Sequence, residues 1–231
     1  KYKIDDSKQY IILAKIGVDV EKYPSVYKHL LTHKEKLEKR SDKGNEWYGL
    51  RPCSYYDYFD KPKIIYPDIA LESRFTIDYE GLIPNATLFL IPKADNFLLG
   101  ILNSTTSWFF FKIVCPVIGD KSKRGRLRLK TIYINDLPIP TPTEEIRQKI
   151  DVNVIELLEL NKKLSSLSEK FIRALLRRFK IEKLSKKLQV WYDLTFVEFI
   201  KELKKKKIKL KLSEESEWED YFEEQKKKAQ A

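Results

Sequence analysis

The residues best suited to chemistry form a basic run, Lys121-Ser-Lys-Arg-Gly-Arg-Leu-Arg-Leu-Lys130, which holds no acidic residue. Arginine can bond bidentately to guanine edges or to phosphates, and Gly125 lets the backbone approach a partner closely. The run lies where a loop enters a strand expected over 127–134, so it could project into a nucleic-acid groove. The alternative is a solvated loop followed by a basic strand face. We select as candidate DNA contacts Lys121, Lys123, Arg124, Arg126 and Arg128.

A second set of candidate contacts surrounds the aromatic segment 45–58. Aromatic and arginine side chains can stack on or wedge against bases, and tyrosine can bond phosphate. For Trp47 we prefer a place in the core, together with Trp108 and the apolar strand 87–91. The charged and polar side chains need water or a partner, so the second set comprises Arg40, Lys43, Arg51 and Tyr55.

The remaining charged residues favour solvated surface. The lysine runs at 204–211 and 226–228 are typical of exposed helix faces or tails. His29 and His33 have the i,i+4 spacing of a helical metal site, but no third ligand follows at a useful spacing. We therefore predict no metal site in this chain.

Catalytic patterns are missing from the sequence. A nuclease centre needs paired carboxylates and a lysine around a metal, and the acidic residues between Asp68 and Glu80 lack the closing lysine. The Pro52-Cys53 pair is too little to indicate a nucleophilic thiol. The chain also has no glycine-rich nucleotide loop. We expect no catalytic residue and no cofactor of its own.

Composition indicates a globular protein that favours polyanionic partners. Apolar residues make up 42% of the 231 residues, aromatic residues make up 13%, and the formal net charge is +11. No apolar run reaches the length of a transmembrane helix and no signal segment opens the chain, so we expect no membrane partner. Two cysteines are too few for a disulfide scaffold, which favours the cytoplasm. The chain begins at Lys1 and contains no methionine, so we expect a fragment of a longer protein.

The helix breakers divide the chain, because all ten prolines and all seven glycines lie at or before Pro142. The first part predicts mixed α and β structure. We expect a helix over 21–40, a second over 97–111 with a possible break at Asn103-Ser104, and strands over 63–66, 74–78, 87–91 and 127–134.

The second part predicts helices. Thr141-Pro-Thr-Glu144 has the pattern of a capping box with proline at the first helical position. Apolar residues then recur at heptad spacing from Ile150 to Phe171, with Asn153 at one position of the seam. We expect a long coiled-coil-like spacer helix over about 142–179 and a small helical C-terminal end.

Four short motifs resemble a known family when they are taken in order. They are Trp47-Tyr-Gly-Leu-Arg51, Lys61-Pro-Lys-Ile-Ile-Tyr-Pro67, Gly100-Ile-Leu-Asn-Ser104 and Leu137-Pro-Ile-Pro140. Their order is similar to that in TaqI-like C-terminal specificity domains, the target-recognition half of adenine-N6 DNA methyltransferases and of fused type IIG restriction enzymes. The resemblance covers roughly residues 20–175. The tail at 187–192 also looks like the helical end of large fused enzymes of this kind.

The resemblance implies a function in a bacterial restriction-modification system. Residues 1–140 would be an α+β (mixed α/β) DNA target-recognition domain, 141–180 a spacer helix and 181–231 a C-terminal helical segment. The partners would be double-stranded DNA and the catalytic methyltransferase domain of the same polypeptide. S-adenosylmethionine would bind in the parent, with Mg2+ as a further candidate if the parent also cleaves DNA. Base-reading residues differ between family members, so the contacts selected above rest on their chemistry alone.

Two other functions stay open at this point. The heptad helix could make the chain a protein–protein interaction module whose charges only solvate it. A nuclease site without a recognisable pattern is the other alternative.

Overall fold

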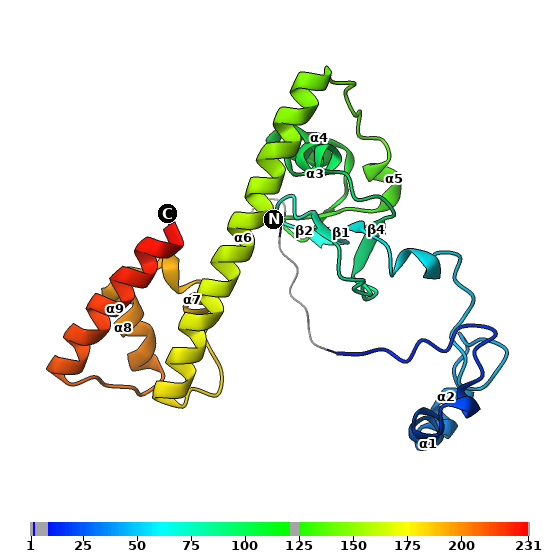
Figure 1. Cartoon of the computed structure of the whole chain (residues 1–231), viewed down its shortest axis with the longest axis horizontal. Helices are drawn as coiled ribbons and strands as arrows, with labels where there is room; N and C mark the ends of the chain where they lie inside the picture. The colour runs from blue at the N-terminus through cyan, green and yellow to red at the C-terminus, as the bar shows by residue number, and fades with distance from the viewer. Residues whose placement is uncertain (1, 3–8, 121–124, 231) are drawn as a thin grey trace. The chain divides into compact units, whose positions relative to one another are not determined.

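The computed structural model describes residue 2 and residues 9–120 and 125–230. The chain divides between Pro142 and Thr143 into two compact units (Figure 1). The first, here called the mixed unit, combines small sheets with helices, and the second, the helical unit, begins with a long helix that shorter helices follow. The predicted fold class is therefore confirmed. The predicted division at residues 140 and 180 stays a prediction.

The central sheet of the mixed unit is antiparallel, in the order β3-β1-β4. Its strands are β1 (Lys63–Pro67), β3 (Thr76–Asp78) and β4 (Leu88–Ile91), close to the segments expected from the sequence. Strand β1 is central, with Ile65 opposite both Thr76 and Leu90. The first four residues of β1 are buried, whereas β4, which we expected to lie buried in the core, is half-buried throughout.

A bent pair of helices packs beside this sheet. The predicted helix over 97–111 breaks at the expected place, giving α3 (Asn96–Asn103) and α4 (Thr105–Val114) at 62° to each other. The Asp95 side chain caps α3 by accepting from the Leu98 amide, and the Ser104 side chain caps α4 by accepting from the Ser107 amide. The aromatic core includes Tyr66, Phe75 and Phe111, whose rings pack at centroid distances of 4.9 and 6.2 Å. Trp108, which we expected in the core, is half-buried.

No single helix among the described residues is long and apolar enough to cross a membrane. The bent pair α3–α4 reaches that length and apolar character only when its two helices are taken together, and four of its apolar side chains are buried within the protein: Phe97, Leu99, Leu102 and Phe111.

The second small sheet has the order β2-β6-β5 and presents the basic segment. Its strands are β2 (Ile69–Ala70), β5 (Val117–Ile118) and β6 (Arg126–Arg128), all antiparallel. The predicted strand 127–134 was too long, because a short helix, α5 (Thr131–Ile134), follows β6.

The N-terminal part of the mixed unit has a small core of its own. It contains η1 (Val20–Lys22), α1 (Pro24–Leu31) and α2 (Lys34–Glu38), so the single helix expected over 21–40 is interrupted. Their core is formed by Ala14, Val20 and Leu30, with half-buried Trp47 packed against it. A further short helix, η2 (Tyr56–Tyr58), precedes β1.

The helical unit is built on α6 (Glu144–Phe179). The helix begins two residues later than predicted, because Thr143 and not Thr141 is the N-cap and accepts from the Ile146 amide. The shorter helices that follow are α7 (Lys186–Gln189), η4 (Trp191–Asp193), α8 (Phe196–Lys205) and α9 (Leu212–Gln230). They pack with the C-terminal half of α6 in one core that includes Phe171, Trp191, Phe199 and Phe222, each at most 1% exposed.

Candidate nucleic-acid interface

Two of the predicted contacts, Arg126 and Arg128, share the exposed face of β6. Successive side chains point to opposite faces of a strand, so the buried Leu127 between them anchors the strand in the core. Ile118 and Ile69 lie opposite the two arginines on the flanking strands. The fold therefore holds two guanidinium groups on one side of a short, paired strand.

The two arginines differ in the partners they already have. The Nε of Arg128 lies 3.5 Å from a carboxylate oxygen of Asp68, which restrains the guanidinium without covering it. Arg126 is exposed and forms no ion pair with any residue that the structure describes. Arg126 is thus the better placed of the two to donate hydrogen bonds to a phosphate or a base edge. The other three candidates of the basic run, Lys121, Lys123 and Arg124, lie outside the described residues.

Arg40 holds the backbone of the aromatic loop, and Lys43 bonds the last residue of α2. Arg40 donates from Nη2 to the carbonyls of Gly49, at 3.0 Å, and Trp47, at 3.3 Å, and from Nε to the Leu37 carbonyl. Lys43 donates to the carbonyl of Glu38 at 2.8 Å. Because the guanidinium of Arg40 already donates to three carbonyls, it is better placed to stabilise the loop than to bind an external ligand.

Arg51 and Tyr55 remain exposed. Arg51 pairs with Asp42 at 3.1 Å. Tyr55 packs edge-on against Phe59, and a hydrogen bond with the Cys53 thiol raises the pKa of its hydroxyl. These side chains are accessible, but no described contact unites them with the arginines of β6.

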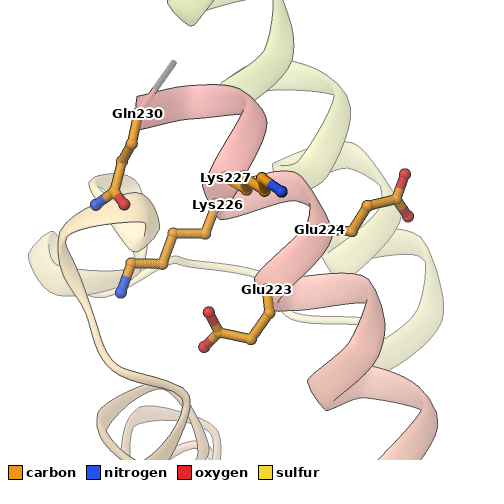
Figure 2. Close-up of a pocket in the computed structure, with 5 residues that line it drawn as sticks. All are labelled: Glu223, Glu224, Lys226, Lys227 and Gln230. Carbon is orange, nitrogen blue, oxygen red and sulfur yellow. The ribbon is translucent and has the colours of Figure 1, made fainter.

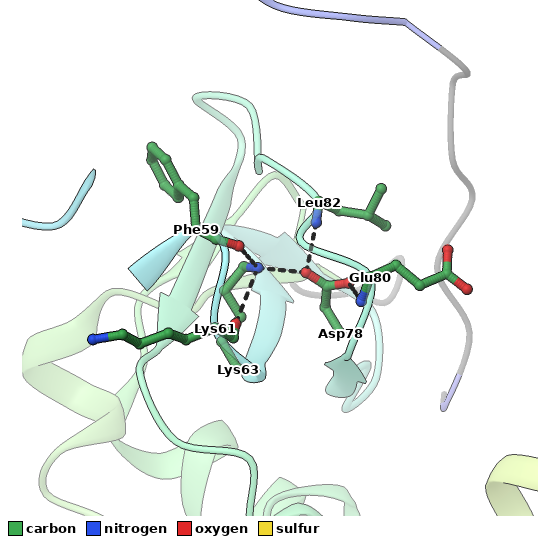
Figure 3. A network of polar contacts seen from close by, with 6 residues as sticks. All are labelled: Phe59, Lys61, Lys63, Asp78, Glu80 and Leu82. Atoms are coloured by element: carbon green, nitrogen blue, oxygen red, sulfur yellow. Dashed lines mark hydrogen bonds and ion pairs between the residues drawn. The ribbon is translucent and has the colours of Figure 1, made fainter. Parts of the chain in front are cut away.

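A buried ion pair that the sequence analysis missed supports the central sheet. Lys63 on β1 and Asp78 on β3 are both fully buried and bond to each other, as Figure 3 shows. Lys63 also donates to the Phe59 carbonyl at 2.6 Å, while Asp78 accepts from the amides of Glu80 and Leu82. The pair ties the segment before β1 and the segment after β3 to the sheet. The motif 61–67 contains this lysine, and its hydrophobic neighbours were the only sequence signal for its burial.

The motif 100–104 has an equally structural role. Asn103, 4% exposed, accepts from the Phe75 amide at 3.1 Å and donates to the Phe75 carbonyl at 2.9 Å. Both main-chain groups that lead into β3 are thereby satisfied by the last residue of α3. The motif residues thus position the scaffold that presents β6.

Within the described residues no group of three or more His, Cys, Asp or Glu side chains could hold a metal ion. His29 and His33 lie edge-to-face with ring centroids 5.1 Å apart. Burial raises the pKa of the Cys115 thiol to about 11, so that thiol is a weak nucleophile at neutral pH.

The fold and these contacts define a small α/β module with an arginine-bearing strand, joined to a helical unit. The chain belongs to the TaqI-like C-terminal specificity domain family, whose model matches residues 1–139. This confirms the resemblance inferred from the four motifs. A second family model, described as a domain of unknown function (DUF8810), matches residues 143–231.

Two curated relatives of the chain are both named as type II methyltransferases. The chain is 31% identical over 157 residues to the type II methyltransferase M.BanIII of Aneurinibacillus aneurinilyticus, covering 64% of this chain and 27% of the relative. It is 28% identical over 178 residues to the type II methyltransferase M.MjaIV of Methanocaldococcus jannaschii, covering 71% of this chain and 58% of the relative. The matched region therefore spans only part of either relative.

Proposed function

We propose that the chain recognises a specific double-stranded DNA sequence on behalf of a bacterial restriction-modification enzyme. The observation that carries this proposal is the match of the specificity-domain family to residues 1–139. Specificity domains and methyltransferase relatives belong to one kind of system, in which a DNA target must be selected before it is modified.

The geometry of β6 supports the same function. Arginine is the side chain that most often reads guanine, through two parallel hydrogen bonds in the major groove. Arg126 and Arg128 project from one strand face, and the Asp68 carboxylate beside Arg128 can hold that guanidinium in a fixed orientation. We keep Lys121, Lys123 and Arg124 as further candidate DNA contacts. We also keep Arg51 and Tyr55, as candidate contacts at a separate place.

The parent polypeptide would supply the chemistry. We infer an adenine-N6 methyltransferase domain in the same polypeptide, which flips the target base and methylates it from S-adenosylmethionine while this chain holds the duplex in register. An endonuclease activity with Mg2+ is a further proposal for the parent. Such a system acts on DNA in the cytoplasm.

A selection from a random duplex library tests the proposal. The chain should enrich one short sequence, and the variant Arg126→Gln/Arg128→Gln should lose that preference, with about 1–3 kcal/mol lost for each base read. The matched control Lys28→Gln/Lys36→Gln removes the same charge from α1 and α2 and should keep the preference. Failure of the unaltered chain to enrich any sequence would overturn the proposal.

A protein–protein interaction through α6 is the second candidate. Leu157 and Leu160 of the heptad seam are 39% and 44% exposed, whereas Phe171 in the same seam is buried. The exposed half of the seam could pair with another helix. Concentration-dependent association in sedimentation experiments, together with no binding to duplex DNA, would favour this function over target recognition.

A further inference from the structure

A groove lined by cations runs between α6 and α9 in the helical unit. The two helices pack side by side and run antiparallel (Figure 1). Glu214 near the start of α9 bonds Arg178, while Lys228 near the end of α9 lines a hollow with Leu160 of α6. Three adjoining hollows lie along this seam and share lining residues. The hollow at Lys170–Arg177 has a volume of about 570 Å³, and the hollow at Leu160–Lys170 has a volume of about 840 Å³. The groove therefore extends over much of the C-terminal half of α6.

The charge of this groove is strongly one-sided. Among the described residues that line the three hollows, only Glu217 carries a carboxylate. Arg178 and Lys228 are paired with Glu214 and Glu224. Five further lining cations are exposed and form no ion pair with any described residue; these are Lys162, Lys163, Lys170, Arg173 and Arg177.

The spacing of these cations follows one face of the helix. Lys163, Lys170 and Arg177 are seven residues apart, so they lie almost above one another along about 21 Å of helix axis. One strand of duplex DNA presents a phosphate about every 3.4 Å along its axis. A stripe of this length can therefore meet several successive phosphates.

The floor of the groove is held by the core beneath it. The ring of Tyr221 stacks on buried Phe171 with 5.7 Å between centroids and 8° between planes. Ala174, beside Tyr221, contributes only a methyl group and so leaves the groove open. The cations therefore lie on a helix that is packed firmly against the core.

A second hollow in the same unit shows the opposite pattern. Figure 2 shows the surface of α9 lined by Glu223, Glu224, Lys226, Lys227 and Gln230. Lys226 donates to the Leu194 carbonyl, Gln230 donates to the Tyr192 carbonyl, and Glu224 pairs with Lys228. Its charges are mixed, and Lys226 and Gln230 bond the segment before α8, so this hollow offers little to an anion.

We propose that the α6–α9 groove binds the sugar-phosphate backbone of duplex DNA without reading its sequence. The inference rests on the proposed function, because the duplex would be the one that the mixed unit recognises. Two sites on one polypeptide raise the effective concentration of the second site once the first is bound. The helical unit would then add affinity, and the mixed unit would add selectivity.

The salt dependence of binding tests this division of roles in the full chain. The probe is a random-sequence duplex of about 30 base pairs, titrated between about 50 and 200 mM salt. In Lys163→Gln/Lys170→Gln/Arg177→Gln the slope of log affinity against log salt should fall by about 2 to 3, because each lost phosphate contact removes about 0.9. The control Lys201→Gln/Lys204→Gln/Lys209→Gln removes three exposed cations of the same unit and should keep the slope.

Two further measurements separate this proposal from target recognition. The groove variant should weaken binding to a selected target and to random duplex by the same factor, whereas Arg126→Gln should weaken binding to the target alone. The charge-preserving variant Lys163→Arg/Lys170→Arg/Arg177→Lys should bind like the unaltered chain. An unchanged slope in the groove variant overturns the groove proposal and leaves target recognition standing. Failure of the unaltered chain to bind random duplex, or a preference for single-stranded RNA that depends on the same three residues, also overturns it.

Discussion

At the scale of single residues, the side chains within the family motifs build the scaffold more than the contact surface. Asn103 satisfies both main-chain groups of Phe75, Lys63 anchors β1, and buried Gly49 presents its carbonyl to Arg40. The exposed arginines of β6 lie outside the four motifs. This separation suits a recognition module, because the scaffold can stay constant while the contact residues change with the target.

The buried pair Lys63–Asp78 should be essential for stability. In Asp78→Ala the ammonium of Lys63 stays buried without its counter-charge, and the amides of Glu80 and Leu82 lose their acceptor. We expect the free energy of unfolding to fall by about 3–5 kcal/mol in urea titrations. The control Asp60→Ala removes an exposed carboxylate two residues before Pro62 and should change stability by less than about 0.5 kcal/mol. A loss of similar size in both variants would contradict the role given to the pair.

Glu202 should make the helical unit sensitive to acid. Hydrogen bonds from Lys205 Nζ, at 2.6 Å, and from Ser185 Oγ, at 2.7 Å, lower the pKa of the Glu202 carboxyl in the folded state. Since the folded pKa lies below the unfolded value of about 4.3, this stabilisation is fully present above that value. It is lost as the pH falls through the folded pKa.

The test compares the free energy of unfolding of the unaltered chain and of Glu202→Gln between neutral and acidic pH. The variant should be less stable at neutral pH, and the difference should shrink as the pH falls below the unfolded pKa. Two parallel curves over the whole range would show that the carboxylate contributes no linked stability.

At the scale of elements, the end of α6 offers a stabilising substitution. Lys180 closes the helix in the left-handed conformation, with φ 51° and ψ 40°, which costs energy for any residue with a Cβ. Lys180→Gly should raise the free energy of unfolding by about 0.5–1 kcal/mol, as measured by thermal and urea unfolding. Lys183→Gly is the matched control, because Lys183 does not have a positive φ and glycine there only frees the unfolded chain. Destabilisation by Lys180→Gly would contradict this account of the helix end.

The elements themselves were predictable where periodicity and breakers agreed. The break at Asn103-Ser104 lies where it was expected, and the heptad pattern together with the absence of proline and glycine after Pro142 indicated the long helix α6. The strand expected over 127–134 ends at Arg128, because Thr131 soon starts a helical turn that buries Ile134 and exposes Ile132. Short apolar runs fit both periods, and tertiary packing decides between them.

The candidate interface was predictable in part. The basic run pointed to β6, and the strand alternation then placed Arg126 and Arg128 on its exposed face. The role of Arg40 as an anchor of the loop was not predictable, because it depends on a hydrogen bond to the carbonyl of Gly49, nine residues further along the chain. No local sequence pattern indicates that bond. The cations of the α6–α9 groove do have one, the seven-residue spacing of Lys163, Lys170 and Arg177. This spacing indicates a binding surface only once the structure shows that α9 leaves the face of α6 with these cations uncovered.

At the scale of the whole molecule, the core of the helical unit crosses the boundary expected near residue 180. Phe171 and Leu175 of α6 are buried in one cluster with Trp191, Phe199 and Phe222. The ring of Phe171 stacks on that of Trp191 with 3.8 Å between centroids. The C-terminal helices therefore depend on the second half of α6 for their central packing.

This dependence makes two fragments informative. The fragment 143–231 should fold alone and unfold cooperatively, because every residue of its buried cluster lies within it, and the emission of Trp191 and Trp218 together should be blue-shifted. The fragment 181–231 lacks Phe171 and Leu175, whose removal from the core would cost several kcal/mol, about 3–5 for a buried phenylalanine alone. It should show no cooperative transition in circular dichroism, and its tryptophan emission should be red-shifted relative to that of 143–231. Cooperative folding of 181–231 would mean that the spacer helix only borders the C-terminal helices, whereas failure of 143–231 to fold would mean that the helical unit depends on the mixed unit for its stability.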